Sequence, residues 1–352
     1  MCLFSAHNLD KDSYIVMGQL PLTALRICGM GQGGMGMRVE EILGLFPEEC
    51  RDRWREVAKL AKHLQEIRIR ADMPLTILVD NGELFVDMQG RIVDVPEEAA
   101  RPTPEQMESM LGHLCRYSVY AFADEIRQGF LTVQGGHRVG LAGQVVLDGE
   151  GRISNMKYIR YLNIRIAHQI RGAADALMPW LFEKGRVMST LLISPPGGGK
   201  TTMLRDLIRQ VSDGTVYGRG VNVSVVDERS EIAGSYLGVS QNDVGIRTDV
   251  LDGCPKVEGM MRLIRSMAPQ VLAVDEVGSL ADAQALQMAG GCGCKLLATV
   301  HGGSMEEVRQ KNYMRYVIEQ GLFERYVMLD RRRGMSRIVG IYDREGKPCT
   351  RQ

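Results

Sequence analysis

The chain of 352 residues is long enough for about two domains, each with its own core. Hydrophobic residues make up 45% of it and charged residues 24%, values that are typical of a globular protein and exclude a largely disordered or membrane-embedded chain. Lys plus Arg and Asp plus Glu total 43 each, so no overall charge attracts nucleic acid or an anionic membrane.

The first residues of the chain lack the features of a membrane or secretion signal. The apolar stretch 14–30 is broken by Pro21 and Arg26, which argues against a spanning helix and a signal peptide. A helical pattern begins only after Met37, so we expect residues 1–37 to be disordered or a mis-assigned extension. The 8 cysteines show no C-x-x-C spacing of a zinc site, and their scatter favours the reducing cytoplasm.

Helical and strand-like patterns alternate through residues 38–171. Apolar residues recur at helical spacing on both sides of Pro47, which predicts two helices between residues 38 and 64. Thr103 and Pro104 form a typical helix start. We expect further helices over 104–116 and 121–128, and strands over 65–70, 75–79, 83–86, 130–146 and 151–171, with Asn81-Gly82 as a turn. This pattern predicts an α+β domain.

Beyond Gly172, which we take as the domain boundary, the pattern changes. We expect a connecting helix over 173–184 and then alternating strands and helices, which is typical of a parallel sheet. The apolar run 187–193 leads into a glycine-rich segment and then into a helical stretch at 203–211. The segment itself reads Ser194, Pro195, Pro196, Gly197, Gly198, Gly199, Lys200, Thr201 and Thr202.

This strand–loop–helix arrangement predicts a P-loop for ATP and Mg²⁺. Glycines allow backbone N–H groups to surround phosphate oxygens, Lys200 reaches the terminal phosphates, and the Thr201 hydroxyl ligates magnesium. The strict pattern has glycine where Ser194 stands, and the alternative is a chance glycine turn. We therefore predict an α/β fold with a RecA-like P-loop NTPase domain and a mostly parallel sheet over 172–345, preceded by the smaller α+β domain and followed by a tail at 346–352.

Acidic residues follow two other predicted strands. Asp275 and Glu276 come after the strand 271–274, where we expect Asp275 to hold magnesium through water and Glu276 to orient or deprotonate the attacking water. Glu228 belongs to the acidic stretch 227–231 after the strand 221–226, which could complete the magnesium shell or position water. The alternatives are a solvated turn for the first pair and a surface ion pair for the second.

His301 and four arginines complete the candidate site. His301 follows the strand 295–299 and could sense the terminal phosphate by hydrogen bonding, although a lone loop histidine is often structural. Arginines can stabilise charge on a transferring phosphate, from the same chain or a neighbouring one. An ion-paired surface role is the alternative for each of them. The candidates are Arg68, Arg70, Arg138 and Arg165.

In this order the four strand-end clusters resemble those of the secretion ATPase family of type II and type IV secretion and pilus assembly. Lys200 matches the P-loop lysine, residues 227–231 the acidic box and His301 the histidine box of that family. Its second Walker motif usually reads Gly-Glu, so the match there reaches Glu276 and not Asp275. Within this family the stretches 66–75, 120–143 and 163–172 are similar to the stage III sporulation protein AA branch of endospore-forming bacteria.

The resemblance implies an ATPase that powers assembly or transport for a sporulation channel. It implies a homo-hexameric ring in the cytoplasm, peripheral at the inner face of the mother-cell membrane, with other stage III sporulation channel proteins as partners. From the residues alone two other functions stay open: a nucleotide-gated nucleic-acid-binding protein with Arg68, Arg70 and Arg138 in a phosphate-binding groove, and a small-molecule kinase. The balanced charge leads us to expect no nucleic acid partner.

Overall fold

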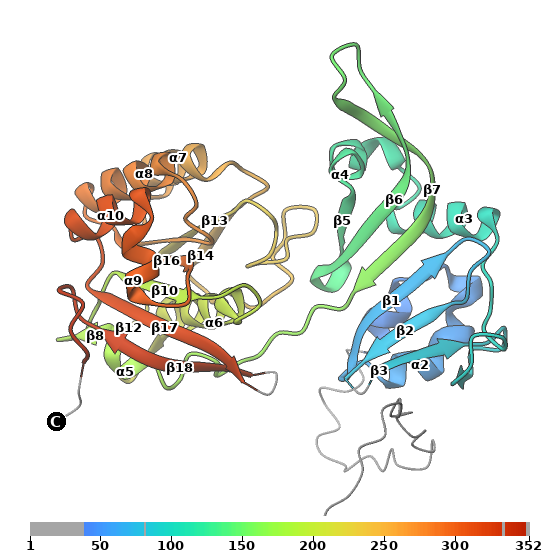
Figure 1. The fold of residues 1–352 in the computed structure, drawn as a ribbon, viewed down its shortest axis with the longest axis horizontal. Helices are drawn as coiled ribbons and strands as arrows, with labels where there is room; N and C mark the ends of the chain where they lie inside the picture. The colour runs from blue at the N-terminus through green and yellow to red at the C-terminus, as the bar shows by residue number, and fades with distance from the viewer. Residues whose placement is uncertain (1–38, 81, 333–334, 350–352) are drawn as a thin grey trace, which may run out of the picture.

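The computed structural model describes residues 39–80, 82–332 and 335–349 (Figure 1). The expected extension at 1–37, Asn81 of the expected turn and residues 350–352 of the expected tail lie outside these ranges. Two seven-stranded sheets follow one another along the described part of the chain, the first with one hydrophobic core and the second with a core on each face. Within the described ranges no helix is both long and apolar enough to cross a bilayer.

The first sheet is antiparallel throughout, with the strand order β4-β3-β2-β1-β7-β6-β5. Ile67 at its centre pairs with Ile77 on one side and Ile164 on the other, and all three are fully buried. The alternation of a half-buried sheet therefore leaves Arg68 and Arg70 on the opposite face of the strand from Ile67. The strands are β1 Leu64–Arg70, β2 Thr76–Val79, β3 Gly82–Val86, β4 Ile92–Val93, β5 Phe130–Val133, β6 His137–Leu147 and β7 Ile153–Arg165.

Short helices cover the buried face of this sheet. Pro47 separates a helical turn at residues 39–44 from the next helices, as predicted, and Phe46 stacks on Trp54 with ring centroids 3.7 Å apart. Thr103 caps the longest helix through a reciprocal hydrogen-bond pair with Gln106. The helices are η2 Glu48–Trp54, α2 Arg55–Lys59, α3 Pro104–Leu114, η3 Val119–Phe122, α4 Ala123–Gln128 and η4 Gln134–Gly136.

Two expectations for the connecting region are wrong. The strand expected over 151–171 ends at Arg165, and the helix expected over 173–184 is a single turn, α5 Met178–Leu181. Pro179 fits only the first turn of a helix, because it has no N–H to donate, so a helix could begin there but not run through it. The backbone N–H of Ala174 instead donates to the carboxylate of Asp206, 2.9 Å away.

The second sheet has the order β14-β13-β15-β16-β10-β17-β18, and its neighbours are parallel except for the last pair. Its strands are β10 Thr190–Ser194, β13 Val223–Asp227, β14 Thr248–Asp252, β15 Val271–Val274, β16 Lys295–His301, β17 Arg325–Arg332 and β18 Met335–Tyr342. Short strands β8 Phe182–Glu183 with β9 Arg186–Val187 and β11 Gly214–Thr215 with β12 Gly218–Arg219 form two small hairpins. The tip of the expected C-terminal hairpin, residues 333–334, lies outside the described part of the chain.

Helices cover both faces of this sheet, which explains why its strands read as continuous apolar runs. Leu191 and Ile193 of β10 pack into one core with α7, α8, α9 and α10, whereas Leu192 packs into the other with α5 and α6. The helices are α6 Lys200–Asp213, α7 Lys256–Met267, α8 Leu280–Gly291, α9 Met305–Gln310 and α10 Asn312–Glu319. The α/β class predicted from the sequence is confirmed, and parallel pairing brings the carboxyl ends of β10, β13, β15 and β16 to one edge.

Candidate functional site

The loop between β10 and α6 can be built only with glycine at its centre. Gly197 and Gly199 have φ of 70° and 84°, the left-handed region that side chains disfavour. A Cβ on Gly198 would lie 1.7 Å from Ser194 Oγ, and one on Gly199 would lie 1.6 Å from Ser336 Oγ. Pro196 is exposed, Ser194 is fully buried, and the loop leads directly into the N-terminus of α6.

Lys200 opens α6 and turns its ammonium group back over the loop. Its Nζ donates to the carbonyl oxygens of Ser194 and Pro195, at 3.3 and 3.4 Å, and to His301 Nδ1 at 2.9 Å. The residue is 7% exposed. Burial lowers the pKa of Lys200, and the negative charges of Asp275 and Glu276 offset part of this effect. The loop therefore holds one buried positive charge beside neutral acceptors.

A carboxylate lies next to the first hydroxyl of α6. Thr201 Oγ1 donates to Asp275 Oδ2 at 2.7 Å, and Thr299 Oγ1 donates to Asp275 Oδ1 at 2.5 Å. Asp275 follows β15 and Thr299 lies in the adjacent strand β16, so the parallel pairing of these strands sets the spacing. A hydroxyl and a carboxylate oxygen are hard donors of the kind that Mg²⁺ binds.

Glu276 and His301 extend the polar chain that starts at Lys200. Because His301 Nδ1 accepts from Lys200, its Nε2 carries the proton and donates to Glu276 Oε1 at 3.1 Å. Glu276 has a φ of 53°, which is uncommon for a residue with a side chain, and its N–H donates to Thr299 Oγ1 at 2.8 Å. Arg229 lies 3.7 Å from the other oxygen of the carboxylate.

These groups face a cavity of about 960 Å³, which is at the upper end of the range for small-molecule sites. Gly197, Gly199 and residues 200–202 form one wall, with Asp275, Glu276 and His301 beside them. The other wall is formed by the last residue of β7, Arg165, and by the segment that joins the two sheets, through His168, Ile170 and Arg171. Glycine backbone, one ammonium, hydroxyls and carboxylates thus converge on a single hollow between the two sheets.

Residues 37–349 match the family model described as sporulation stage III, protein AA. The chain belongs to this family. A relative, "Stage III sporulation protein AA" of Bacillus subtilis (strain 168), is 36% identical over 314 residues, which cover 89% of this chain and 98% of that protein.

Two solved structures share the fold of this chain. The ATPase DotB of Legionella pneumophila has a TM-score of 0.53 at 12% identity, with 83% of this chain and 80% of that chain covered. The ATPase DotB of Yersinia pseudotuberculosis has the same TM-score and identity, with 85% and 80% covered. The likeness to them is one of fold alone.

Of the expected loop residues, Ser194, Pro195, Pro196 and Gly198 do not line the cavity. Of the expected catalytic and arginine residues, the structure leaves four outside it. Glu228 bonds Lys256 Nζ at 2.5 Å, because α7 begins beside the end of β13. Arg68 and Arg70 line a separate hollow of about 320 Å³ in the first sheet, where Arg68 is paired with Glu66. The fourth, Arg138, bonds Glu231 at 2.7 Å and lies over a phenylalanine ring of β5. Only Arg165 of the four arginines reaches the cavity.

The acidic stretch after β13 has a structural role at its first residue. Asp227 is 2% exposed, and its carboxylate accepts from the backbone N–H groups of Glu231, Ile232 and Ala233 at 2.9, 3.0 and 2.8 Å. Burial raises the pKa of Asp227 although these hydrogen bonds oppose the shift. Asp227 therefore holds the following loop, and Glu231 is the member of the stretch that lines the cavity.

Several residues around the site were not predicted from the sequence, among them Thr299 and the cavity-lining His168 and Arg171. Three others support the site from distant segments. Ser336 Oγ of β18 donates to the Gly198 carbonyl at 2.9 Å, and Lys311 Nζ donates to the His301 carbonyl at 2.6 Å. Arg205 of α6 donates to the carbonyl oxygens of residues 231 and 232. No motif marks a serine in a hairpin strand or a lysine between two helices, since their roles depend only on where distant segments meet. Of the three, Arg205 could most easily have been predicted from the sequence, because it lies on the helix that begins at the loop.

Proposed function

We propose that this chain is a magnesium-dependent ATPase with a RecA-like P-loop domain, and that ATP binds in the cavity between the two sheets. The observation that carries the proposal is the convergence of Lys200 Nζ, the left-handed glycine loop and the Thr201–Asp275 pair on that cavity. A glycine loop at a helix N-terminus, with a lysine above it, has the chemistry of a phosphate site.

The residues present fit both ATP and Mg²⁺. Backbone N–H groups of residues 197–199 and the Lys200 ammonium would hold the phosphates. The Thr201 hydroxyl would ligate the metal directly and Asp275 through water, because these two side chains are already adjacent. When bound, magnesium neutralises negative charge on the phosphate oxygens.

The contacts of Glu276 and His301 suggest a role for each in hydrolysis. Glu276 would orient or deprotonate the attacking water. A phosphate offers Lys200 a charged acceptor in place of the two carbonyl oxygens and the imidazole that it contacts here, so phosphate binding would release His301 Nδ1. His301 also donates to Glu276, so a change in its contact with Lys200 on phosphate binding would alter the position of Glu276, the residue that positions water.

Membership of the sporulation family supports a cellular role for this ATPase. We propose that hydrolysis powers assembly or transport by the channel complex between mother cell and forespore. The ATPase would act as a homo-hexamer, in the cytoplasm at the inner face of the mother-cell membrane, with other stage III sporulation channel proteins as partners and no nucleic acid. Residues 38–171 and 172–345 would be the two domains, and the cavity would lie between them.

Calorimetric titration of the purified chain with ATP, with and without Mg²⁺, tests the proposal when turnover is measured in the same samples. We expect ATP to bind with Mg²⁺ present and phosphate to be released. A chain that binds no adenine nucleotide in the presence of a divalent cation would rule out the proposed ATPase.

A further inference from the structure

Residues 231–243, named here the bridging segment, leave the second sheet and pack against the first. Tyr236 is 8% exposed and belongs to the hydrophobic core of the first sheet, with the Arg116 guanidinium 4.9 Å from its ring centroid. Its neighbours Leu237 and Val239 are 61% and 64% exposed. The buried Tyr236 ring, followed by these two exposed apolar residues, is the anchor of this segment.

A second contact joins the bridging segment to the turn between β5 and β6. The N–H of Gly135 donates to Gln241 Oε1 at 2.9 Å. A Cβ on Gly136 would lie 3.3 Å from Gln241 Cβ and 3.5 Å from the Gly234 carbonyl oxygen. The two backbones therefore approach each other as closely as glycine allows.

The beginning of the bridging segment is tied to the helix that follows the P-loop. Arg205 of α6 donates to the carbonyl oxygens of Glu231 and Ile232, at 2.5 Å each. The side chain of Glu231 lines the cavity and bonds Arg138 of β6. Arg138 is in turn the strand partner of Arg165, which lies on the far wall of the cavity.

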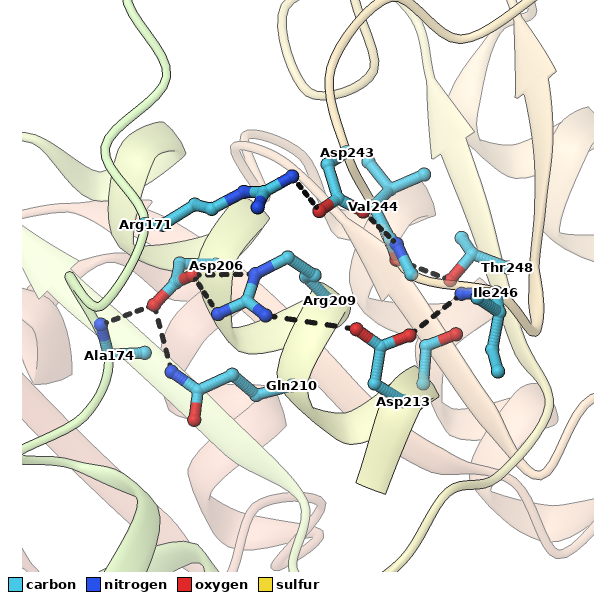
Figure 2. A network of polar contacts seen from close by, with 12 residues as sticks. Arg171, Ala174, Asp206, Arg209, Gln210, Asp213, Asp243, Val244, Ile246 and Thr248 are labelled. Atoms are coloured by element: carbon cyan, nitrogen blue, oxygen red, sulfur yellow. Dashed lines mark hydrogen bonds and ion pairs between the residues drawn. The ribbon is translucent and has the colours of Figure 1, made fainter. Parts of the chain in front are cut away.

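The end of the bridging segment holds the connection between the two sheets. Gln169 exchanges two hydrogen bonds with the backbone of Asp243, at 2.7 and 3.0 Å, and Arg171 pairs with the Asp243 carboxylate at 2.8 Å. Figure 2 shows this pair beside Asp206 of α6, which accepts from the Ala174 N–H. Burial acts to raise the pKa of Asp206, but hydrogen bonds from Ala174, an arginine and a glutamine hold it below its ordinary value.

We propose that Tyr236 and Gln241 are positioning residues for ATP hydrolysis, which hold the cavity wall bearing Arg165 against the wall bearing Lys200. The inference rests on the ATPase function proposed above. Neither residue lines the cavity, so each acts through the walls that it joins. The residues proposed to bind the phosphates, 197–201, all lie in one wall of the cavity. Removing the Tyr236 side chain should therefore impair turnover more than ATP binding.

Steady-state kinetics with Mg²⁺ and ATP test this for Tyr236→Ala, Tyr236→Phe and Leu237→Ala. We expect Tyr236→Ala to lower kcat about ten- to hundredfold, because misplacing a catalytic wall by an ångström costs that much, while KM changes less than about threefold. Tyr236→Phe keeps the buried ring and Leu237→Ala removes only an exposed neighbour, so both should stay within about twofold of wild type. A Tyr236→Ala chain with wild-type kcat would overturn the inference, as would an equal loss in Leu237→Ala.

A double-mutant cycle with Arg165→Ala separates positioning from general damage to the fold. If Tyr236 acts by placing Arg165, the Tyr236→Ala/Arg165→Ala chain should be no slower than Arg165→Ala alone. The inference would be overturned if the loss of kcat in the double variant equalled the product of the losses in the two single variants. It would also be overturned by wild-type turnover in Arg165→Ala. Should Tyr236→Ala fail to fold, Gln241→Ala decides in the same cycle, since it leaves the core intact. A wild-type chain without turnover would instead remove the proposed ATPase function itself.

Discussion

Lys200 carries a buried positive charge whose nearest hydrogen-bond partners are two carbonyl oxygens and an imidazole. Such a charge contributes little to folding, because burial disfavours it and lowers its pKa. We expect Lys200→Ala to lower kcat/KM for ATP by at least about hundredfold, the usual loss when one donor to developing charge is removed. Its melting temperature should equal or exceed that of wild type.

A matched control is Lys59→Ala, which removes an exposed lysine paired with Glu56 in the first half of the chain. Turnover and melting temperature of this variant should match those of wild type. Unchanged turnover in Lys200→Ala would contradict the assignment of the loop.

Glu276 is held by the His301 ring, and this contact does not require a negative charge on the side chain. Glu276→Gln keeps an oxygen that can accept from His301 Nε2 but has no base for the attacking water. We expect it to bind ATP within about threefold of wild type and to lower kcat about hundredfold, the range for loss of a general base. Trapping of labelled ATP with Mg²⁺ checks this, and rapid release of phosphate by the variant would contradict it.

At the scale of the elements, the parallel strands β13 and β14 both end in a carboxylate, and these two residues, Asp227 and Asp252, are neighbours in the register. Burial, aided by the charge of Asp227, raises the pKa of Asp252 to about 6, although Ser230 donates to it. The folded state therefore binds more protons than the unfolded chain between about pH 4 and 6. Ionisation of this carboxyl thus lowers the free energy of unfolding as pH rises through that window.

Asp252→Asn removes the charge and keeps an oxygen that accepts from Ser230. We expect a melting temperature about 2 °C above that of wild type at pH 8, and no difference at pH 4; the gain is small because Asp252 is partly exposed to solvent. Asp249→Asn on the same strand is the control for loss of one charge. A gain of equal size at both pH values would contradict the argument.

The elements that the sequence predicted well are those whose signal is local. The glycine loop, the apolar strands of the second sheet and the helix started by Thr103 and Pro104 lie close to their expected positions. The helix predicted over 173–184 is wrong for two reasons. Pro179 allows a helix only to begin there, and the Ala174 N–H donates to Asp206 instead of taking part in a helix. Only Pro179 is visible in the sequence. Glu228 is an acidic residue at the end of a strand, as the predicted role required. It pairs instead with Lys256 of the neighbouring helix, and this contact could not be predicted from the sequence.

At the scale of the whole molecule, the cavity has walls from two sheets that belong to one chain, and the bridging segment ties them together. A ring would place such cavities at repeated positions around a symmetry axis. We expect light scattering with Mg²⁺ and ATP to give about 235 kDa, six copies of the 39.1 kDa chain. A monomeric mass both with and without ATP would contradict the hexamer.

The contact between Ser336 and the Gly198 carbonyl has a practical consequence for shortened forms of the protein. Strand β18 pairs with β17 at the edge of the second sheet, so a chain cut after β17 would lose both its last strand and the hydroxyl that bonds the glycine loop. Deleting β18 should thus weaken nucleotide binding, although Ser336 of this strand is 138 residues from Gly198 in the sequence. Any truncated version intended for binding studies has to extend through Tyr342.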